Sequence, residues 1–295
     1  MGPGGGPTPF ERATSVTPVP GRPGSYLAEI GDDWDAPILP QGGVVTAVAL
    51  RAMAAHLDEP DKRLRSVTTV FAAQVPPGPS HVEVEVLRRG RGMSQLTATV
   101  AAHGAAAGHT SMAVFGADRP GFSFTDVAPP PVPGPDACRS MRDPLPEGVE
   151  ERWQWRFAPF WEHVEMRLAL GHALWEQWTP TTSESASWLR FDQPPRNPAG
   201  ALDPLAVVAL CDTMPGAVGE RVGPDQPLWR APSADLTVHM LGEATTDWLL
   251  AHKRARHAGE GYASLELTLW TETKALVAFA TQMMFFSFPE GPPAQ

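Results

Sequence analysis

The sequence predicts an α+β fold made of two similar halves, each a long helix wrapped by a curved antiparallel sheet. Three observations support this prediction. The chain has 295 residues, a comfortable length for two domains of common size. An apolar helical run followed by four strand-like segments occurs twice along the sequence. Between the two occurrences lies a proline-rich stretch that can form neither a helix nor a central strand.

The first helix is expected over residues 44–57, directly after the sequence Pro40-Gln41-Gly42-Gly43. This run is rich in Ala, Val and Leu, which is typical of a helix buried on most of its circumference. In the second of the strands that follow it, valines alternate with His and Glu, so that one face is apolar and the other faces water. The four expected strands are residues 66–71, 81–87, 96–102 and 109–115.

The second half repeats this order. Asp203 is a helix-capping residue type and Pro204 suits the first helical position, so a helix is expected over residues 205–214. One helix inside a curling antiparallel meander is the arrangement called a hotdog, and two in tandem make a double hotdog. The strands expected here are residues 234–241, 247–252, 262–270 and 276–286.

The expected domain organisation follows from these elements. Residues 1–20 are expected to form a disordered lead-in, 21–119 the first hotdog, 120–150 a linker and 151–290 the second hotdog. A tryptophan-rich stretch opens the second half and is expected to supply a first strand or an interface element. Its tryptophans are Trp153, Trp155, Trp161, Trp175 and Trp178.

Composition and charge narrow the classes of partner. The chain carries 33 acidic and 23 basic residues without a basic block, which argues against a nucleic-acid or anionic-membrane partner. No apolar run approaches the roughly 20 residues of a membrane span. The amino terminus lacks the pattern of a signal peptide, and Cys138 and Cys211 form no CxxC pair. These features predict a soluble, cytoplasmic protein without a structural zinc.

Two polar residues interrupt apolar patterns. Asp212 lies in the second helical run, one turn after Val208, and a buried carboxylate needs partners or a function. The alternative is that Pro215 ends the helix there and Asp212 faces water. Gln282 shares a face with otherwise apolar residues of the last strand, so its amide needs hydrogen-bond partners, in either a structural or a catalytic role.

Three blocks of the sequence resemble the bacterial acyl-CoA thioesterase II family. They are Pro40-Gln41-Gly42-Gly43, the segment 84–91 (VEVLRRGR) and the segment 276–282 (LVAFATQ), in the family's order. In that family a helix aspartate, a Ser or Thr at the start of a strand and a carboxy-terminal Gln orient the hydrolytic water. By this resemblance the three roles fall on Asp212, Ser233 and Gln282. Ser233 has no signal of its own, because a serine after proline is ordinary turn chemistry.

The resemblance implies hydrolysis of a thioester carried on coenzyme A or on an acyl carrier, with no metal or redox cofactor. Gly42 and Gly43 could donate backbone N–H groups to the developing oxyanion, or form a plain tight turn. Lys253 and Arg254 lie in the densest basic segment and could meet the phosphates of coenzyme A, or form a solvated strand end.

The sequence is also compatible with other functions. A hotdog hydratase or dehydratase would use a histidine beside the helix, and the second half offers no well-placed one. A binding protein that holds an acyl-CoA or another hydrophobic ligand is a further alternative, and it would not need the three polar residues to meet. Hotdog halves pair through their sheets, so a homo-oligomer is also compatible with the sequence.

Overall fold

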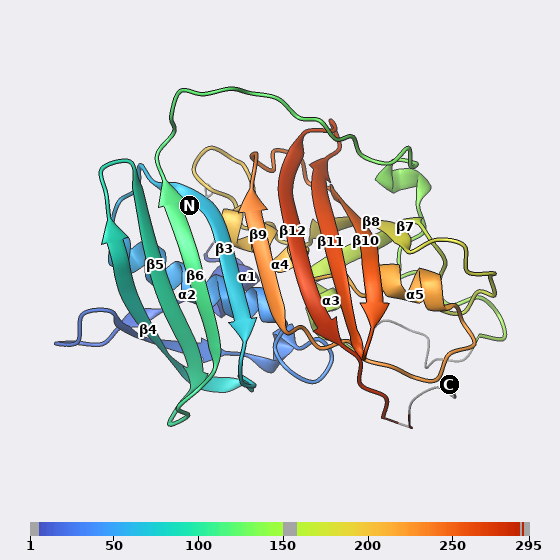
Figure 1. Ribbon diagram of the computed structural model, residues 1–295, viewed down its shortest axis with the longest axis horizontal. Coiled ribbons are helices and arrows are strands. Elements are labelled where there is room, and N and C mark those ends of the chain that lie inside the picture. Colours follow the sequence, from blue (N-terminus) through green and yellow to red (C-terminus); the bar gives the residue numbers. More distant parts are fainter. Residues whose placement is uncertain (1–5, 150–157, 290, 292–295) are drawn as a thin grey trace.

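The computed structural model describes residues 6–149, 158–289 and 291, and their strands form one antiparallel sheet (Figure 1). The strand order is β1-β2-β4-β5-β6-β3-β9-β12-β11-β10-β8-β7. In the first half, the elements are α1 (Pro9–Ala13), β1 (Thr17–Pro18), β2 (Ser25–Ile30), α2 (Gly42–Leu57), β3 (Arg63–Phe71), β4 (Gly78–Arg89), β5 (Met93–Ala102) and β6 (His109–Gly116). In the second half, they are α3 (Phe160–His163), β7 (Val164–Leu170), β8 (Glu184–Phe191), α4 (Pro204–Cys211), α5 (Gly216–Val222), β9 (Asp235–Met240), β10 (Leu249–Gly259), β11 (Tyr262–Thr271) and β12 (Leu276–Phe285).

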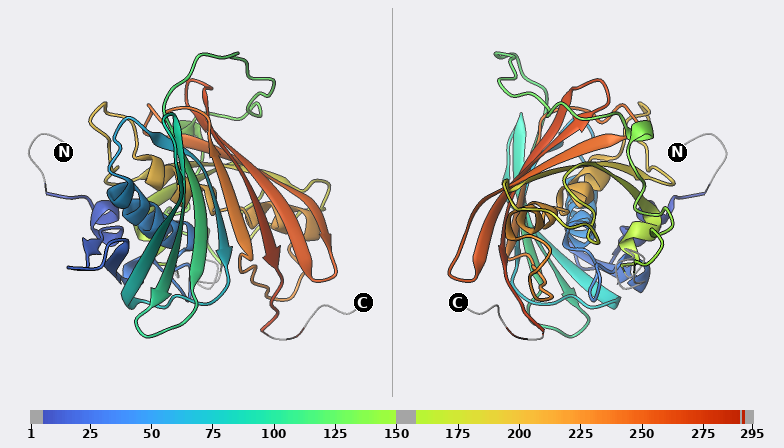
Figure 2. Two further views of the ribbon diagram at one scale, coloured as in Figure 1. Left: turned by 60° about the vertical axis from the view of Figure 1, so that its left-hand side comes forward. Right: turned by 90° about the vertical axis from the view of Figure 1, so that its right-hand side faces the viewer.

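The two halves join edge to edge in the middle of the sheet. Strand β3 pairs antiparallel with β9, with Thr68 opposite Thr237. The helices lie on one side of this continuous sheet, which curves around them (Figure 2). Because α2 and α4 also pack against each other, the two halves share one hydrophobic core.

The predicted order of a helix followed by four strands is confirmed in both halves, as α2 with β3–β6 and as α4 with β9–β12. Of the strands that precede the two helices, β1, β2 and β8 were missed, whereas β7 lies in the tryptophan-rich stretch that was expected to supply a first strand or an interface element. In β8 the reason is chemical. Its inward face carries Ser185 and Ser187 beside Leu189, so the apolar alternation that identifies a strand is broken.

Helix α4 is shorter than predicted, because it ends at Cys211. Proline at position 215 cannot donate a backbone hydrogen bond to a preceding turn. The Asp212 N–H instead bonds to the Ala209 carbonyl at 3.2 Å, which tightens the last turn. The chain then turns and starts the short helix α5 at Gly216. Asp212 therefore stands at a helix end, where its side chain is free to turn away from the helix axis.

The prediction of a disordered lead-in over residues 1–20 is wrong for α1 and β1. Thr8 and Glu11 form a capping box at the start of α1, and Pro9 occupies its first position. Phe10 is buried, and its ring packs edge-on against Trp34 and Phe191. A single large aromatic side chain thus fixes this segment to the second half. Residues 1–5 lie outside the described residues.

The proline-rich segment between the halves has no helix or strand over residues 117–134. Its second part crosses the outer face of the sheet, where the Trp188 indole N–H donates to the Pro133 carbonyl at 2.8 Å. Val132 and Cys138 pack there on a small apolar cluster. The cluster consists of Ala186, Trp188, Trp248, Leu250 and Trp270. Of the tryptophan-rich stretch, Trp153 and Trp155 lie outside the described residues, whereas α3 and β7 fall within it. Among the described helices, none is long and apolar enough to cross a membrane.

The contact between α2 and α4 depends on a glycine. A Cβ atom on Gly43 would lie 2.8 Å from the Cα of Ala209 and 3.0 Å from the carbonyl oxygen of Val208. Both are backbone atoms of α4 and cannot rotate away. Gly43 therefore sets how closely the two helices approach.

We expect Gly43→Ala to lower the free energy of unfolding by about 1–3 kcal/mol, because the added methyl group forces the two helices apart. Denaturant unfolding measures this change. Gly219→Ala in α5 is the matched control, since a Cβ there meets nothing within 4 Å. In a helical position with room for the methyl group that substitution stabilises by roughly 0.5–1 kcal/mol. Equal effects of the two substitutions would contradict the close helix contact.

Candidate active site

Asp212 is the centre of a hydrogen-bonded group that draws on both halves of the chain. The helix ends just before Pro215, as in the alternative in which Asp212 would face water. The carboxylate nevertheless turns inward from the end of α4. The Gly43 N–H, in the first turn of α2, donates to Oδ2 at 2.8 Å. Ser233 Oγ donates to Oδ1 at 3.3 Å, and Gln282 Nε2 donates to the same oxygen at 2.5 Å.

Ser233 and Gln282 reach Asp212 from the end of the sheet. Gln282 lies on β12 with its side chain buried, on the same face as Ala280 and Met284, as the alternation predicted. Ser233 precedes β9 and forms a bridge with Met284, which brings it beside Gln282. Gln282 Nε2 also donates to Ser233 Oγ at 2.6 Å. The structure thus brings together the three residues that the resemblance assigned to the water.

The other end of the Gln282 amide is unsatisfied. Its Oε1 is buried and has no hydrogen-bond partner among the described residues. A buried acceptor without a donor is costly, and such atoms in proteins are commonly satisfied by water or ligand. An acceptor therefore stands open next to the Asp212 carboxylate.

The electrostatics of the site favour a carboxylate that titrates near neutrality. Burial raises the pKa of Asp212 to about 6, while the hydrogen bonds from Gly43, Gln282 and Ser233 oppose this shift. The positive end of the α2 dipole faces the carboxylate and favours its charged form. Because none of its hydrogen-bond donors carries a full charge, burial outweighs the stabilisation of the anion.

Gln41 holds the loop at the end of α4, and sequence reasoning assigned it no role in the site. It caps α2, with Oε1 accepting from the Val44 N–H at 2.8 Å. Its Nε2 donates to the carbonyls of Ala209 and Asp212, at 2.8 and 3.0 Å. Gln is an unusual capping residue. That exception, directly before two glycines, was the signal available in the sequence.

Gly42 lets the start of α2 lie close to both the Asp212 carboxylate and the ring of Phe71. A Cβ at this position would lie 2.9 Å from Asp212 Oδ2 and 2.7 Å from the ring of Phe71. The Phe71 N–H donates to the carbonyl of Ala234 at 3.0 Å, which places Phe71 close to the neighbouring residue Ser233. Phe71 is therefore a wall of the site that sequence reasoning missed. The Gly43 N–H, one of the two expected oxyanion donors, is already bonded to Asp212.

The structure does not bring Lys253 and Arg254 together. They are neighbours on β10 and so point to opposite faces of the sheet. Arg254 lies on the outer face, with Nε donating to Glu184 at 2.9 Å. Lys253 points inward and is only 4% exposed. The expected contact of this pair with phosphates stays a prediction for Arg254, whereas Lys253 does not reach the surface.

The corresponding position in the first half carries no carboxylate. Asp212 is the ninth residue after Asp203, the N-cap of α4. The ninth residue after Gln41, the N-cap of α2, is the fully buried Leu50. The next residue, Arg51, instead forms an ion pair with Asp203 at 3.0 Å. The two helix contacts related by the repeat are thus chemically different, and only the one at the end of α4 carries a carboxylate.

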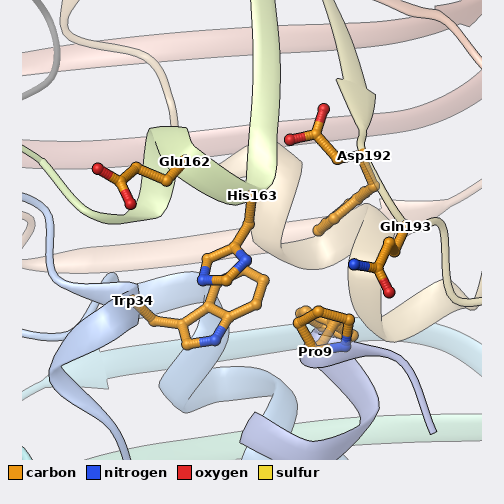
Figure 3. A pocket seen from close by; sticks show the side chains of 8 residues that line it. Pro9, Trp34, Glu162, His163, Asp192 and Gln193 are labelled. Atoms are coloured by element: carbon orange, nitrogen blue, oxygen red, sulfur yellow. The ribbon is translucent and has the colours of Figure 1, made fainter. Parts of the chain in front are cut away.

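A separate pocket lies between α1, α3 and the end of β8 (Figure 3). Trp34 and His163 stack face to face there, with ring centroids 4.1 Å apart. It shares no lining residue with the Asp212 site. In the described part of the chain, no group of three or more His, Cys, Asp or Glu residues is arranged to hold a metal ion.

Known structures share this fold over almost the whole chain. A hotdog-fold protein of unknown function from Alicyclobacillus acidocaldarius is 25% identical, with a TM-score of 0.78, covering 95% of this chain and 98% of the other. A putative thioesterase II from Thermobifida fusca is 24% identical, with a TM-score of 0.75 and the same coverage. An acyl-CoA thioesterase II from Mycobacterium marinum is 19% identical, with a TM-score of 0.71, covering 96% and 99%. These likenesses show a hotdog fold.

A search of curated proteins finds no match to this chain. Models of protein families, in contrast, match its sequence in both halves. The model of the acyl-CoA thioesterase N-terminal domain matches residues 30–116. The model of the acyl-CoA thioesterase C-terminal domain matches residues 135–286, more than half of the chain. The chain therefore belongs to the acyl-CoA thioesterase family and is a thioester hydrolase.

Proposed function

We propose that this chain is a tandem of two hotdogs that hydrolyses an acyl thioester by direct attack of a water molecule. Asp212, Ser233 and Gln282 hold that water, and the products are the free acid and the thiol. The thiol is coenzyme A or an acyl carrier. One observation carries the proposal: a buried carboxylate with a pKa of about 6 is bonded to the two polar side chains that the family pattern requires.

The water lies between two acceptors. One of its hydrogens points to an Asp212 carboxylate oxygen, and the other points to the unpartnered Oε1 of Gln282. With both hydrogens engaged, a lone pair of the water oxygen faces the thioester carbonyl. Ser233 does not act as a nucleophile in this scheme. Its hydroxyl accepts from Gln282 and donates to Asp212, and so fixes the direction of both side chains.

The chemical steps balance without a covalent enzyme intermediate. The water oxygen bonds to the acyl carbon while Asp212 takes a proton from the water as general base. The resulting oxyanion is stabilised by the Gly42 backbone N–H at the start of α2, which lies beside the Asp212 carboxylate. The carbon–sulfur bond then breaks, and the proton passes from Asp212 to the leaving thiolate.

The assembled site separates this proposal from a binding role. A protein that only holds its ligand has no need for a carboxylate buried at a cost in stability. The three side chains come from a helix end, a strand entry and the last strand, segments up to 70 residues apart in sequence. Release of free thiol from a panel of acyl-CoAs tests the function directly, and no release from any of them would favour the binding role.

We expect Asp212→Asn to lower kcat by a factor on the order of 10² or more, because the amide cannot accept a proton from the water. Steady-state thiol release measures the rate. Asp203→Asn at the other end of α4 is the matched control, since Asn caps a helix as well as Asp does. The control should retain most of the wild-type rate, and an unchanged rate in Asp212→Asn would rule out the general base.

The rate of hydrolysis should fall as the pH is lowered through about 6, because protonated Asp212 cannot act as a base.

The free energy of unfolding should instead rise as the pH is lowered over the same range. The folded-state pKa lies above the unfolded value, so ionisation of Asp212 disfavours the folded state as the pH rises from about 4 to about 6. A pH profile of kcat/KM and unfolding curves of wild type and Asp212→Asn measure both. An inflection that persists in the variant's stability would assign it to another group.

A further inference from the structure

The chain contains three lysines among its 23 basic residues, and two of them, Lys62 and Lys253, are buried. Lys62 is fully satisfied. Its ammonium is paired with the Glu59 carboxylate and donates to the Gly90 carbonyl at 2.7 Å and to Ser94 Oγ at 3.1 Å. This is the ordinary structural solution for a buried lysine, because a charge out of water needs a counter-ion and hydrogen-bond acceptors.

Lys253 lacks that solution. Its hydrogen bond in the described structure is a long one of 3.4 Å to Ser187 Oγ. No carboxylate of a described residue lies within 4 Å of it. Ser185, directly opposite Lys253 on β8, is 4% exposed, and its hydroxyl has no partner among the described residues. An ammonium and a hydroxyl thus stand side by side in the interior without an anion between them.

The nearby acidic side chain does not fill this role. Glu220 of α5 is buried, but its carboxylate accepts from the His172 backbone N–H at 2.8 Å and contacts the His172 ring at 2.7 Å. Burial lowers the pKa of Lys253 to about 8, and no carboxylate opposes this shift. An anion that entered the site would favour the charged amine and satisfy both free groups at once.

The Lys253 site faces the same interior as the proposed catalytic residues. Lys253 is in register with Leu267 on β11, and Leu267 with Ala280 on β12, two residues before Gln282. With strands about 4.8 Å apart and a rise of about 3.3 Å per residue, Lys253 and Gln282 are separated by roughly 12 Å along the inner face. Helix α5 connects the two places. It begins four residues after Asp212, and a Cβ on its first residue would lie 3.5 Å from Ser185 Oγ.

We propose that Lys253, Ser185 and Ser187 bind a carboxylate at the far end of the substrate's acyl group, so that the preferred substrates are thioesters of dicarboxylic acids. This inference rests on the proposed function of the Asp212 site. A phosphate of coenzyme A is a poor fit, because Lys253 is buried beneath α5 and cannot be reached from the surface. A carboxylate at the end of an acyl chain would instead reach Lys253 along the inner face of the sheet, from the Asp212 site.

The test compares pairs of acyl-CoAs of equal chain length, with and without a terminal carboxylate. For the wild type, kcat/KM should be higher for the carboxylated member at one or more lengths. Lys253→Met should lower the ratio of the two kcat/KM values at least ~30-fold, as expected when one partner of a buried charge pair is removed. Lys274→Met, in an exposed turn, is the matched control and should leave the ratio unchanged.

Ser185→Ala guards against misfolding of the first variant, because it removes a hydroxyl that has no partner to lose. It should lower the ratio several-fold. A ratio that is the same in wild type, Lys253→Met and Ser185→Ala would overturn the inference while leaving the hydrolase intact. If the wild type hydrolyses neither thioester, the proposed function fails. The Lys253 site is then tested by the shift in Tm that free dicarboxylic acids cause in wild type, and no difference from Lys253→Met would overturn it.

Discussion

The hydrogen bond from the Gly43 backbone to the Asp212 carboxylate is the contact on which the arrangement of the molecule depends. It forms because the first turn of α2 meets the end of α4, and that approach requires a residue without a side chain at position 43. Gln41 makes a second connection at the same place, by capping one helix and binding the carbonyls that end the other. The proposed catalytic carboxylate is therefore oriented by the first half although it belongs to the second.

The character of its partners explains why Asp212 suits the role of a base. All of its hydrogen-bond donors are neutral: a backbone amide, a hydroxyl and a side-chain amide. Glu165 shows the contrasting case elsewhere in the chain. Burial opposes its ionisation too, yet Arg167 and Arg190 hold the pKa of that carboxyl below its usual value. A carboxylate paired with two guanidinium groups is a poor proton acceptor, whereas one held by neutral dipoles remains basic.

The parts of this structure that the sequence predicted are those that follow from local periodicity. The two helices, eight of the strands, and the positions of Asp212 and Gln282 as polar exceptions could all be derived from spacing, but spacing left open whether Asp212 faces water. Ser233 came only from the family resemblance, because its bond to Asp212 depends on how a strand entry packs on a helix end. The burial of Lys253 was not foreseen. A run of basic residues suggests solvent, and only the pairing of β8 with β10 beneath α5 shows that one of them points inward.

Leu50 stands in the first half where Asp212 stands in the second, and this difference has a consequence for how such a chain can change over time. In an assembly of two identical subunits, each substitution appears twice and must suit both copies of every environment. In a chain that contains both halves, a residue in one helix can be apolar and pack in the core while its counterpart in the other half stays polar. The buried leucine and the Arg51–Asp203 ion pair use this freedom. The first half supplies packing and a backbone donor to the Asp212 carboxylate, and the chemistry of the second half can change without a matching change in the first.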